Sequence, residues 1–500
     1  MDNQESVQQN SRGGWLVTGA SPKMRLNVIL AALAGLALRM FFIIRFPVTD
    51  SGDAPFYIEL AWNWLKNHVY GFPVHGVLTP VDMRTPGYPA FLAVIFAVAG
   101  QSTRAVMLAQ AVVDVATCFL IAFIAACLAP AERRRRVFVA AFWLAALCPF
   151  TANYTAVVLT ETLVTFLTAL VILVLLETEL ASNGRRVTFL LSPWLLAGII
   201  TGFGTLVRPE TPLVLFAAGL VLGVKWWRAR DWEKLLRAGI LMGIGVMLPL
   251  VPWAVRNWRT LHEVRFLAPR YSELPGEYTP HGFIDWTNTW LWRFRDVYLT
   301  HWKLNEEEIS IDDLASSAFD SPEERARVSE LLDEYNEELT IDPDLDAKFS
   351  EIARERTARH PLRTYLKIPL LRCLVLWFTP RVELLPISGH LTPIAEEWED
   401  DRPDFLETLG LVFANCVYIG LTLAGIWVVP RRTFFWFLIV FMVGRTVFFA
   451  YAVETPEPRY VLECFPALIA VGAQFFGCRF SFLRRARGGW LRGKFAESAP

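Results

Sequence analysis

Long runs of uncharged apolar residues alternate with short polar segments along most of the chain. A helix of about 20 such residues crosses a hydrocarbon core of roughly 30 Å. Ten runs fit this length: 26–45, 105–129, 137–153, 156–176, 188–206, 212–226, 236–255, 408–428, 433–451 and 461–478. Two shorter runs, 88–100 and 366–379, are flanked by Pro or Arg and lie near the lower limit. The pattern predicts an all-α polytopic membrane protein with about ten transmembrane helices.

The segment 257–407 interrupts this pattern. Its middle part, 305–359, is acidic and polar, and SPEERARVSELLDEYNEEL within it has helical spacing. Ser321 and Pro322 fit the N-cap and first position of a helix, followed by two glutamates in its first turn. We therefore expect a small helical lobe outside the membrane. Its acidity is most simply a solvated face, and recognition of an acceptor is the alternative.

The composition agrees with a membrane protein. Apolar residues make up 54% of the 500 residues, charged residues only 19%, and the mean hydropathy is +0.36. The seven cysteines lie mostly in apolar runs without a CxxC spacing, which indicates neither a disulfide framework nor a metal site. No cleavage site follows the first apolar run, so we interpret that run as a signal anchor.

The basic residues orient the predicted spans. If 88–100 and 366–379 lie along the membrane surface, six basic groups fall on one side. These groups are Lys23 with Arg25, Arg133–Arg136, Arg185–Arg186, Lys225–Arg237, Arg431–Arg432 and Arg479–Lys494. The positive-inside bias then predicts that both termini are cytoplasmic. The predicted divisions are a tail 1–25, a core 26–256 with the outer loop 46–104, an outer segment 257–407, spans 408–478 and a basic tail 479–500.

The first outer loop contains the main candidate chemistry. Asp50 and Asp53 follow the first span, and after an amphipathic helical segment the chain returns at Arg84 in RTPGYP. The simplest interpretation of the acids is an Asx-type turn near Gly52. However, a surface helix and a rigid Pro/Gly turn would bring a carboxylate and a guanidinium to one place. That pair suits removal of a proton from a hydroxyl and stabilisation of a departing phosphate.

Several short motifs in order resemble a known family. They are GDAPFYIELA, Tyr70-Gly71, RTPGYPAFLA, Leu159-Thr160-Glu161, Leu206-Val-Arg-Pro-Glu210, Pro252-Trp253-x-x-Arg256-Asn257, His360-Pro361 and Arg459-Tyr460 with Pro466. Together they resemble GT-C-type glycosyltransferases, in particular bacterial proteins related to the protein O-mannosyltransferases and the lipid A aminoarabinose transferase. The resemblance covers roughly 26–260 and 408–478, and implies a GT-C-type helical bundle.

The resemblance implies roles for individual residues. The outer-loop aspartate of the family, four residues before a tyrosine, falls on Asp53 before Tyr57 and would be the general base. Many relatives have Glu next to it, where this chain has Ala54, which leaves Asp50 as a substitute. The second acid falls on Glu161. On an ordinary interpretation Glu161 is only a helix N-terminal acid, yet an unpaired carboxylate in an apolar helix is costly.

Other candidates would bind the donor phosphate or position the substrate. Arg208 with Glu210 is either a local ion pair or a phosphate clamp, and we favour the clamp because a guanidinium binds phosphate bidentately. Further phosphate-binding candidates are Arg84, Arg256, Arg459 and Tyr460, and each could instead be an interfacial anchor. Tyr57 and Glu210 are the candidates for positioning.

The donor is expected to be a polyprenyl-phosphate sugar, because the chain has no nucleotide-binding motif and the site would face outward. No zinc motif is present, and a divalent cation would need Asp50, Asp53 and Glu161 to lie together. Partners would be the bilayer, the lipid-linked donor and a lipid, glycan or protein acceptor, with no nucleic acid. The expected enzyme is an inverting membrane glycosyltransferase of the bacterial inner membrane. The alternatives are a transporter or flippase, and a polymerase or ligase of lipid-linked glycans.

Overall fold

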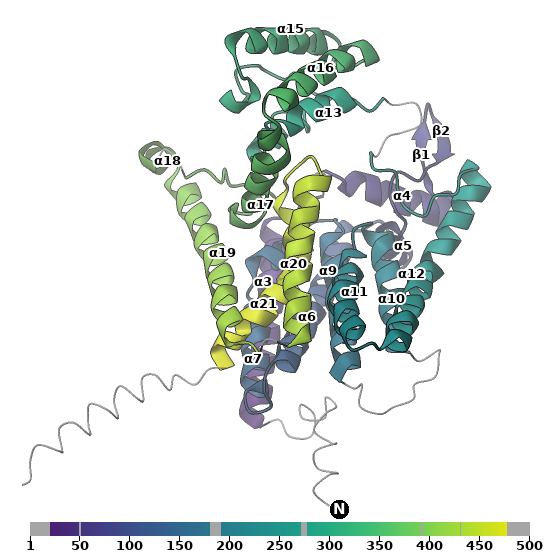
Figure 1. The fold of residues 1–500 in the computed structure, drawn as a ribbon, viewed down its shortest axis with the longest axis vertical. Helices are drawn as coiled ribbons and strands as arrows, with labels where there is room; N and C mark the ends of the chain where they lie inside the picture. Colours follow the sequence, from purple (N-terminus) through teal and green to yellow (C-terminus); the bar gives the residue numbers. More distant parts are fainter. Residues whose placement is uncertain are drawn as a thin grey trace, which may run out of the picture.

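The computed structural model describes residues 21–49, 52–180, 192–271, 278–391, 394–430 and 432–477. Figure 1 shows a helical bundle, with a separate lobe above it and a short hairpin beside its upper end. Both ends of the described chain lie at the lower end of the bundle in this view, the start of α3 (Pro22–Arg45) and the end of η6 (Ala473–Gly477). Asp50 lies outside the described residues.

Helices cover all ten predicted spans. The bundle comprises α3, α6 (Thr103–Leu128), α7 (Arg134–Ala146), α9 (Glu161–Leu180), α10 (Pro193–Val207), α11 (Leu213–Arg228), α12 (Trp232–Leu261), α19 (Arg402–Val428), α20 (Thr433–Ala452) and the η5–α21–η6 series (Pro458–Cys464, Phe465–Gly472 and Ala473–Gly477). Seven helices of the described part are long and apolar enough to cross a membrane, or eight with one bent pair. α10 and α11 are shorter. The chain is thus a mostly helical, multi-pass membrane protein, as the pattern predicts.

The third predicted span is a bent one. α7 ends at Ala146, and a short pair follows, α8 (Pro149–Ala152) and η1 (Asn153–Ala156), with a bend of 51° between the two parts. Pro149 lacks the amide hydrogen that a continuous helix would need, which explains the break. α9 therefore begins only at Glu161, and residues 157–160 form a turn at the upper end of the bundle.

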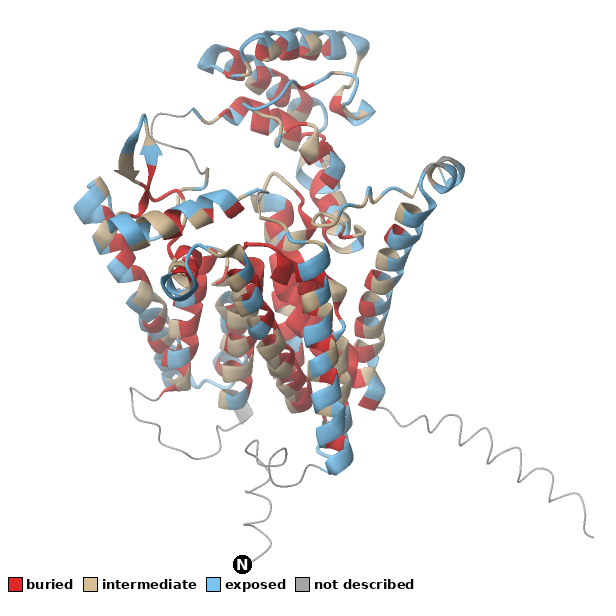
Figure 2. Ribbon diagram, turned by 180° about the vertical axis from the view of Figure 1, so that it is seen from behind, coloured by how far each residue is buried: buried red, intermediate tan, exposed pale blue. Residues whose placement is uncertain are grey.

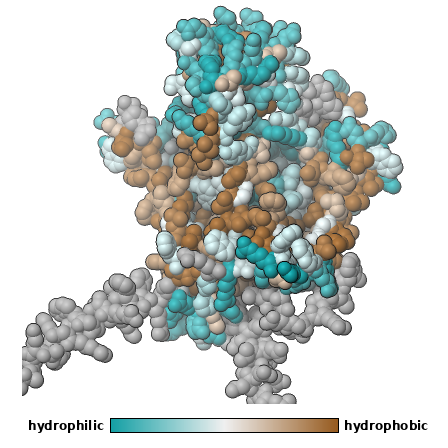
Figure 3. Space-filling view, in the orientation of Figure 1, coloured by the Kyte–Doolittle hydropathy of each residue, from teal (hydrophilic) through white to brown (hydrophobic). Residues whose placement is uncertain are grey.

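An apolar band surrounds the bundle. Figure 3 shows brown surface at the middle height of the molecule, between hydrophilic surface on the lobe above and at the lower ends of the helices. Figure 2 shows that the buried residues concentrate on the inner faces of the helices. Helices α10 and α12 approach closely because Gly198 and Gly245 face each other; a Cβ on Gly198 would lie 2.3 Å from the Met242 carbonyl oxygen. Small residues allow such packing in membranes.

The outer lobe has its own apolar core. It contains α13 (His281–Asn288), α14 (Phe294–Tyr298), η3 (Ser316–Ala318), α15 (Pro322–Glu338) and α16 (Pro343–Arg359). Trp286, Trp290 and Phe349 are fully buried, and the Trp286 ring contacts both other rings within a cluster of aromatic and aliphatic side chains. The predicted start of α15 is confirmed, since the Ser321 hydroxyl accepts a hydrogen bond from the Glu324 amide and Pro322 is the first helical residue.

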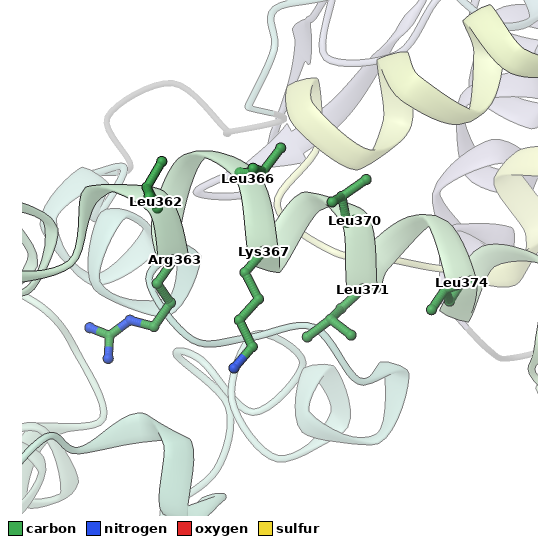
Figure 4. A pocket seen from close by; sticks show the side chains of 7 residues that line it. All are labelled: Leu362, Arg363, Leu366, Lys367, Leu370, Leu371 and Leu374. Atoms are coloured by element: carbon green, nitrogen blue, oxygen red, sulfur yellow. The ribbon is translucent and has the colours of Figure 1, made fainter.

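One helix connects this lobe with the bundle. The π-helical turn η4 (Arg363–Lys367) runs directly into α17 (Ile368–Phe378). Leucines 362, 366, 370 and 374 form an exposed stripe four residues apart, lining a cavity of about 470 Å³ with Arg363 and Lys367 beside it (Figure 4). The run 366–379 was expected along the membrane surface. Figure 1 instead shows α17 descending from the lobe to the bundle.

The upper end of the bundle near the N-terminal half is covered by α4 (Ala54–Asn67), which lies across it in Figure 1. The antiparallel hairpin of β1 (Gly71–Val74) and β2 (Val77–Pro80) follows, and α5 (Gly87–Ala99) leads back to α6. The face of α4 that carries Tyr57, Leu60 and Ala61 is buried, in agreement with the predicted helical spacing.

Two ion pairs lie inside the bundle, which sequence reasoning missed. Arg39 of α3 donates to Asp114 of α6 at 2.8 Å, and both side chains are almost fully buried. Arg445 of α20 pairs with Glu463 of η5, whose other oxygen accepts from Thr168 at 3.1 Å. Each buried charge has its own partner, which is the arrangement that burial demands.

Candidate active site

The predicted pair of Asp53 and Arg84 is present. Asp53 precedes α4, but its carboxylate makes no capping hydrogen bond; only its backbone carbonyl accepts, from the Tyr57 amide at 3.1 Å. The carboxylate instead binds Arg84, with Nη2 and Oδ1 2.6 Å apart. The two side chains remain 30% and 18% exposed. An Asx turn thus does not explain Asp53, whose carboxylate is available to a ligand.

Charges around Asp53 determine its protonation. Burial alone would raise the pKa of its carboxyl, but Arg84, Arg459 and Arg208 outweigh burial and hold the pKa below its ordinary value. Asp53 is therefore a carboxylate at neutral pH. The same result shows that arginines from three separate parts of the chain lie within electrostatic reach of this oxygen.

A second acid lies at the start of α9. Glu161 is almost fully buried, and its Oε1 lies 2.9 Å from Arg208 Nη1 and 3.8 Å from Arg459 Nη1. Arg208 also lies 3.6 Å from Glu210, and Arg459 lies 2.5 Å from Glu457. Burial opposes both shifts, yet the neighbouring charges raise the pKa of Arg208 and lower that of Glu210. Three guanidinium groups thus face four carboxylates.

Two predicted tyrosines border this cluster. The Tyr460 ring lies under both Arg208 and Arg459, at 5.6 and 5.7 Å, while its hydroxyl donates to Glu457 at 3.0 Å. The hydroxyl is thus already hydrogen-bonded to a carboxylate. Tyr57 is buried against Tyr88 with ring centroids 5.1 Å apart, and burial together with the Asp53 charge raises its pKa. Tyr57 packs behind Asp53 and fixes the start of α4.

Backbone contacts bring the loops of the cluster together. Val48, just before the aspartates, forms a parallel bridge with Val157, just before Glu161. The Tyr70 hydroxyl donates to the carbonyl of Arg84 at 2.9 Å, which holds the RTPGYP turn. Gly87 of that turn packs directly on Leu206 at the end of α10. The turns carrying Arg84 and Arg208 are therefore in contact.

Gly87 gives a test of this contact. An added Cβ would lie 2.5 Å from the Leu206 carbonyl oxygen, so Gly87→Ala must move the turn at Gly87 away from the end of α10. We expect a loss of about 1–3 kcal/mol in unfolding free energy and reduced turnover, since Arg84 and Arg208 separate. Thermal unfolding and a transfer assay would measure both. Gly219→Ala is the control, because no atom lies within 4 Å of its Cβ position; equal effects of the two changes would contradict the contact.

Not every predicted residue joins the cluster. Arg256 donates to the carbonyls of Tyr70 at 2.7 Å and Val81 at 2.8 Å, and its guanidinium lies over the Trp253 ring. It therefore holds the ends of the hairpin and is not brought to Asp53. Asp50 lies outside the described residues.

Sequence reasoning missed Glu457, which pairs with Arg459 and Tyr460. The only signal for it is its position two residues before Arg459 in the motif TPEPRY. It missed Glu463 as well, although a carboxylate inside an apolar run was the very signal that drew attention to Glu161.

The acids of the cluster are already paired with arginines, and the described residues contain no group of three or more His, Cys, Asp or Glu arranged for a metal ion. Two cavities of the described part lie elsewhere, one along α17 and one of about 480 Å³ in the lobe near Pro322. Neither of them is lined by Asp53, Glu161 or Arg208.

Fold and site together define a mostly helical, multi-pass membrane protein with a cluster of arginines and carboxylates around Asp53 and Glu161. Residues 83–253 match the family model of the dolichyl-phosphate-mannose-protein mannosyltransferases. This match includes Arg84, Glu161 and Arg208, but neither Asp53 nor Arg459. Over this stretch the chain is similar to a family of the GT-C superfamily of membrane glycosyltransferases, as the resemblance implies. No curated protein matches the sequence.

Two proteins are among those whose solved structures are similar to this chain. One is the oligosaccharyltransferase AglB from Archaeoglobus fulgidus in complex with an inhibitory peptide and a dolichol-phosphate, with 13% identity, a TM-score of 0.49, and coverage of 97% of this chain and 53% of AglB. The other is ArnT from Cupriavidus metallidurans bound to undecaprenyl phosphate, with 12% identity, a TM-score of 0.34, and coverage of 98% and 81%. The chain thus spans about half the length of AglB.

Proposed function

We propose that this protein transfers a sugar from a polyprenyl-phosphate donor to an acceptor hydroxyl at the outer membrane surface. The observation that carries the proposal is the carboxylate of Asp53, 2.6 Å from Arg84 and under the influence of Arg208 and Arg459. Such a site holds a proton acceptor next to several groups that stabilise a phosphate. Support comes also from the family match, which covers Arg84, Glu161 and Arg208.

The mechanism needs one base and one leaving group. Asp53 accepts the proton of the acceptor hydroxyl, and the hydroxyl oxygen forms a bond to the anomeric carbon. The bond between that carbon and the phosphate oxygen breaks, and the polyprenyl phosphate leaves with the electron pair. Arginines at the site stabilise this charge. A single displacement without a covalent intermediate would invert the anomeric centre.

The charge balance suggests how Asp53 becomes active. Because four carboxylates already surround the three arginines, a donor phosphate must compete with them for guanidinium hydrogen bonds. We propose that the phosphate takes over the hydrogen bonds of Arg84, because the ion pair between Arg84 and Asp53 is the most exposed of these pairs. The Asp53 carboxylate is then released towards the acceptor. Release from an arginine also raises the basicity of a carboxylate, which favours proton transfer.

The location belongs to the same proposal. The basic groups of the sequence lie in the tails and in the connections that alternate with the outer segments, so both termini would be cytoplasmic and the site would face outward. The bacterial inner membrane would then contain the protein, with a lipid, glycan or protein as acceptor.

The function can be tested directly. Purified protein reconstituted in lipid vesicles is incubated with radiolabelled undecaprenyl-phosphate sugars, one sugar at a time, in the presence of membrane extract as acceptor. We expect one donor to be consumed with release of undecaprenyl phosphate. Movement of a donor lipid from one leaflet to the other without release of the phosphate would instead support a transporter.

Arg84 sets the acidic limit of activity in this mechanism. The charge of Arg84 is the main factor that lowers the pKa of Asp53, so Arg84→Gln should raise that pKa. A base must be deprotonated, hence kcat/KM falls as the pH drops through the pKa of Asp53. The acidic limb of the pH profile should therefore move to higher pH in Arg84→Gln and stay nearly unchanged in Arg84→Lys. An unmoved limb in Arg84→Gln would argue against Asp53 as the base.

A further inference from the structure

A further carboxyl group near the site has no assigned role. Glu383 lies in the segment between α17 and α19, and its Oε1 accepts a hydrogen bond from the Tyr154 hydroxyl at 2.9 Å. Its other oxygen, Oε2, is buried and has no hydrogen-bond partner among the described residues. Folded proteins pair nearly all buried polar atoms, because an unpaired one costs about 1–3 kcal/mol. The unpaired oxygen is therefore able to accept a hydrogen bond from a molecule outside the chain.

The backbone next to Glu383 is held in an unusual conformation. Arg381 has φ of +62°, a left-handed value that is rare for a residue with a side chain. Its buried guanidinium donates to the carbonyls of Leu376 and Pro458, each at 2.9 Å. Arg381 thus ties this segment to the residue directly before Arg459. These hydrogen bonds hold Arg381, two residues before Glu383, in this conformation.

Glu383 connects to the Asp53 cluster on two sides. Tyr154, which binds Glu383, also accepts a hydrogen bond at its carbonyl from Thr162, next to Glu161. Pro458, which Arg381 binds, is followed by Arg459 and Tyr460 of the cluster. Each path consists of hydrogen bonds and covalent neighbours, so Glu383 borders the same site.

The lobe approaches this border from above. Burial raises the pKa of the Tyr298 phenol in α14, the Glu383 and Glu457 carboxylates raise it further, and Arg459 opposes them. Tyr298 therefore lies within electrostatic reach of the cluster. Its ring stacks edge-on against Trp302 at 4.1 Å, and Trp302 is 45% exposed. A carboxyl group within electrostatic reach of this aromatic pair is chemically suited to a sugar, which offers hydroxyls at its edge and C–H groups on its faces.

We propose that Glu383 determines sugar specificity by binding one hydroxyl group of a sugar in this site through its unpaired Oε2. This inference rests on the proposed function. Burial raises the pKa of Glu383, opposed by the Arg381 charge, by a backbone hydrogen bond from Glu383 itself and by Tyr154, so the group has a greater tendency than a free glutamate to hold a proton. In either protonation state it can hydrogen-bond a hydroxyl. Glu383 is a binding residue in this proposal and takes no part in the proton transfer at Asp53.

The test uses deoxy analogues of the sugar. For the undecaprenyl-phosphate hexose or pentose that the wild-type protein consumes, the analogues lacking one hydroxyl each are compared in the wild type and in Glu383→Ala. Wild-type kcat/KM should fall about 10- to 100-fold for one analogue, the loss expected for one hydrogen bond to a charged or buried group. In Glu383→Ala the parent sugar and that analogue should react equally, while the other analogues keep their ranking.

Two arms locate the hydroxyl. Transfer of the sugar to water without acceptor, followed by release of undecaprenyl phosphate, reports on the donor sugar, and a deoxy series of a glycan acceptor reports on the acceptor. Loss of discrimination in either arm supports the proposal, and unchanged discrimination in both overturns it. Tyr154→Phe should lower kcat/KM for the parent substrate but keep the discrimination. Glu330→Ala on the exposed lobe surface makes the same chemical change as Glu383→Ala and is the matched control. If the wild type consumes no donor, the proposed function fails, and this inference fails with it.

Discussion

Replacing Asp53 with asparagine is expected to reduce kcat by about 10²- to 10⁴-fold, the usual contribution of a general base. The amide keeps the size of the side chain but cannot accept a proton at neutral pH. Donor binding should persist, since the arginines remain. It should even strengthen, because Arg84 loses the carboxylate that competes with the donor phosphate. The kcat and KM for the consumed donor, with donor affinity from equilibrium binding, would measure these effects.

Controls separate chemistry from folding in this experiment. Asp333→Asn on the exposed surface of α15 makes the same chemical change away from the site and should leave kcat unchanged. Asp53 is partly exposed at the end of a turn, so its amide variant should unfold at nearly the wild-type temperature. Near-normal turnover by Asp53→Asn would remove Asp53 from the role of base, whatever the donor affinity.

Local features of the fold were predictable from the sequence. The N-cap of α15 follows from Ser321 and Pro322 because capping depends on adjacent residues. The Asp53–Arg84 pair follows from two features inside one short loop, a helix and a Pro/Gly turn that reverses the chain. The mostly helical, multi-span architecture follows from the apolar runs along the chain. Each of these inferences needs only interactions between residues near one another in the chain.

Long-range partners were not predictable. Tyr154 and Glu383 are 229 positions apart, and neither lies in a motif that indicates the other. Arg256 illustrates the opposite error, a residue predicted to be in the site that is not brought to Asp53. It was one of several arginines near outer helix ends, and sequence could not show that its guanidinium holds the carbonyls of the hairpin. The same limit explains the intramembrane pairs, since each requires knowing which two helices are neighbours.

Arg208→Gln should have the second-largest effect, because Arg208 has two functions. In the proposed mechanism its guanidinium stabilises the leaving phosphate, and loss of one such donor costs about 10²- to 10³-fold in kcat. It also pairs with Glu161, which is only 2% exposed. Breaking a buried pair from one side costs about 3–5 kcal/mol. We expect a loss of unfolding free energy at or below the lower end of this range, since Arg459 remains 3.8 Å from the same carboxylate.

A double variant separates these two functions. Glu161→Gln combined with Arg208→Gln removes the buried charge together with its partner, so most of the lost stability should return, as measured by thermal unfolding. The catalytic defect should remain, because an amide in place of the guanidinium supplies no positive charge to the phosphate. Arg208→Lys provides the charge without bidentate geometry and should recover only part of kcat. If the double variant regained both stability and turnover, Arg208 would be only a structural partner of Glu161, and the phosphate would have to rely on Arg84 and Arg459.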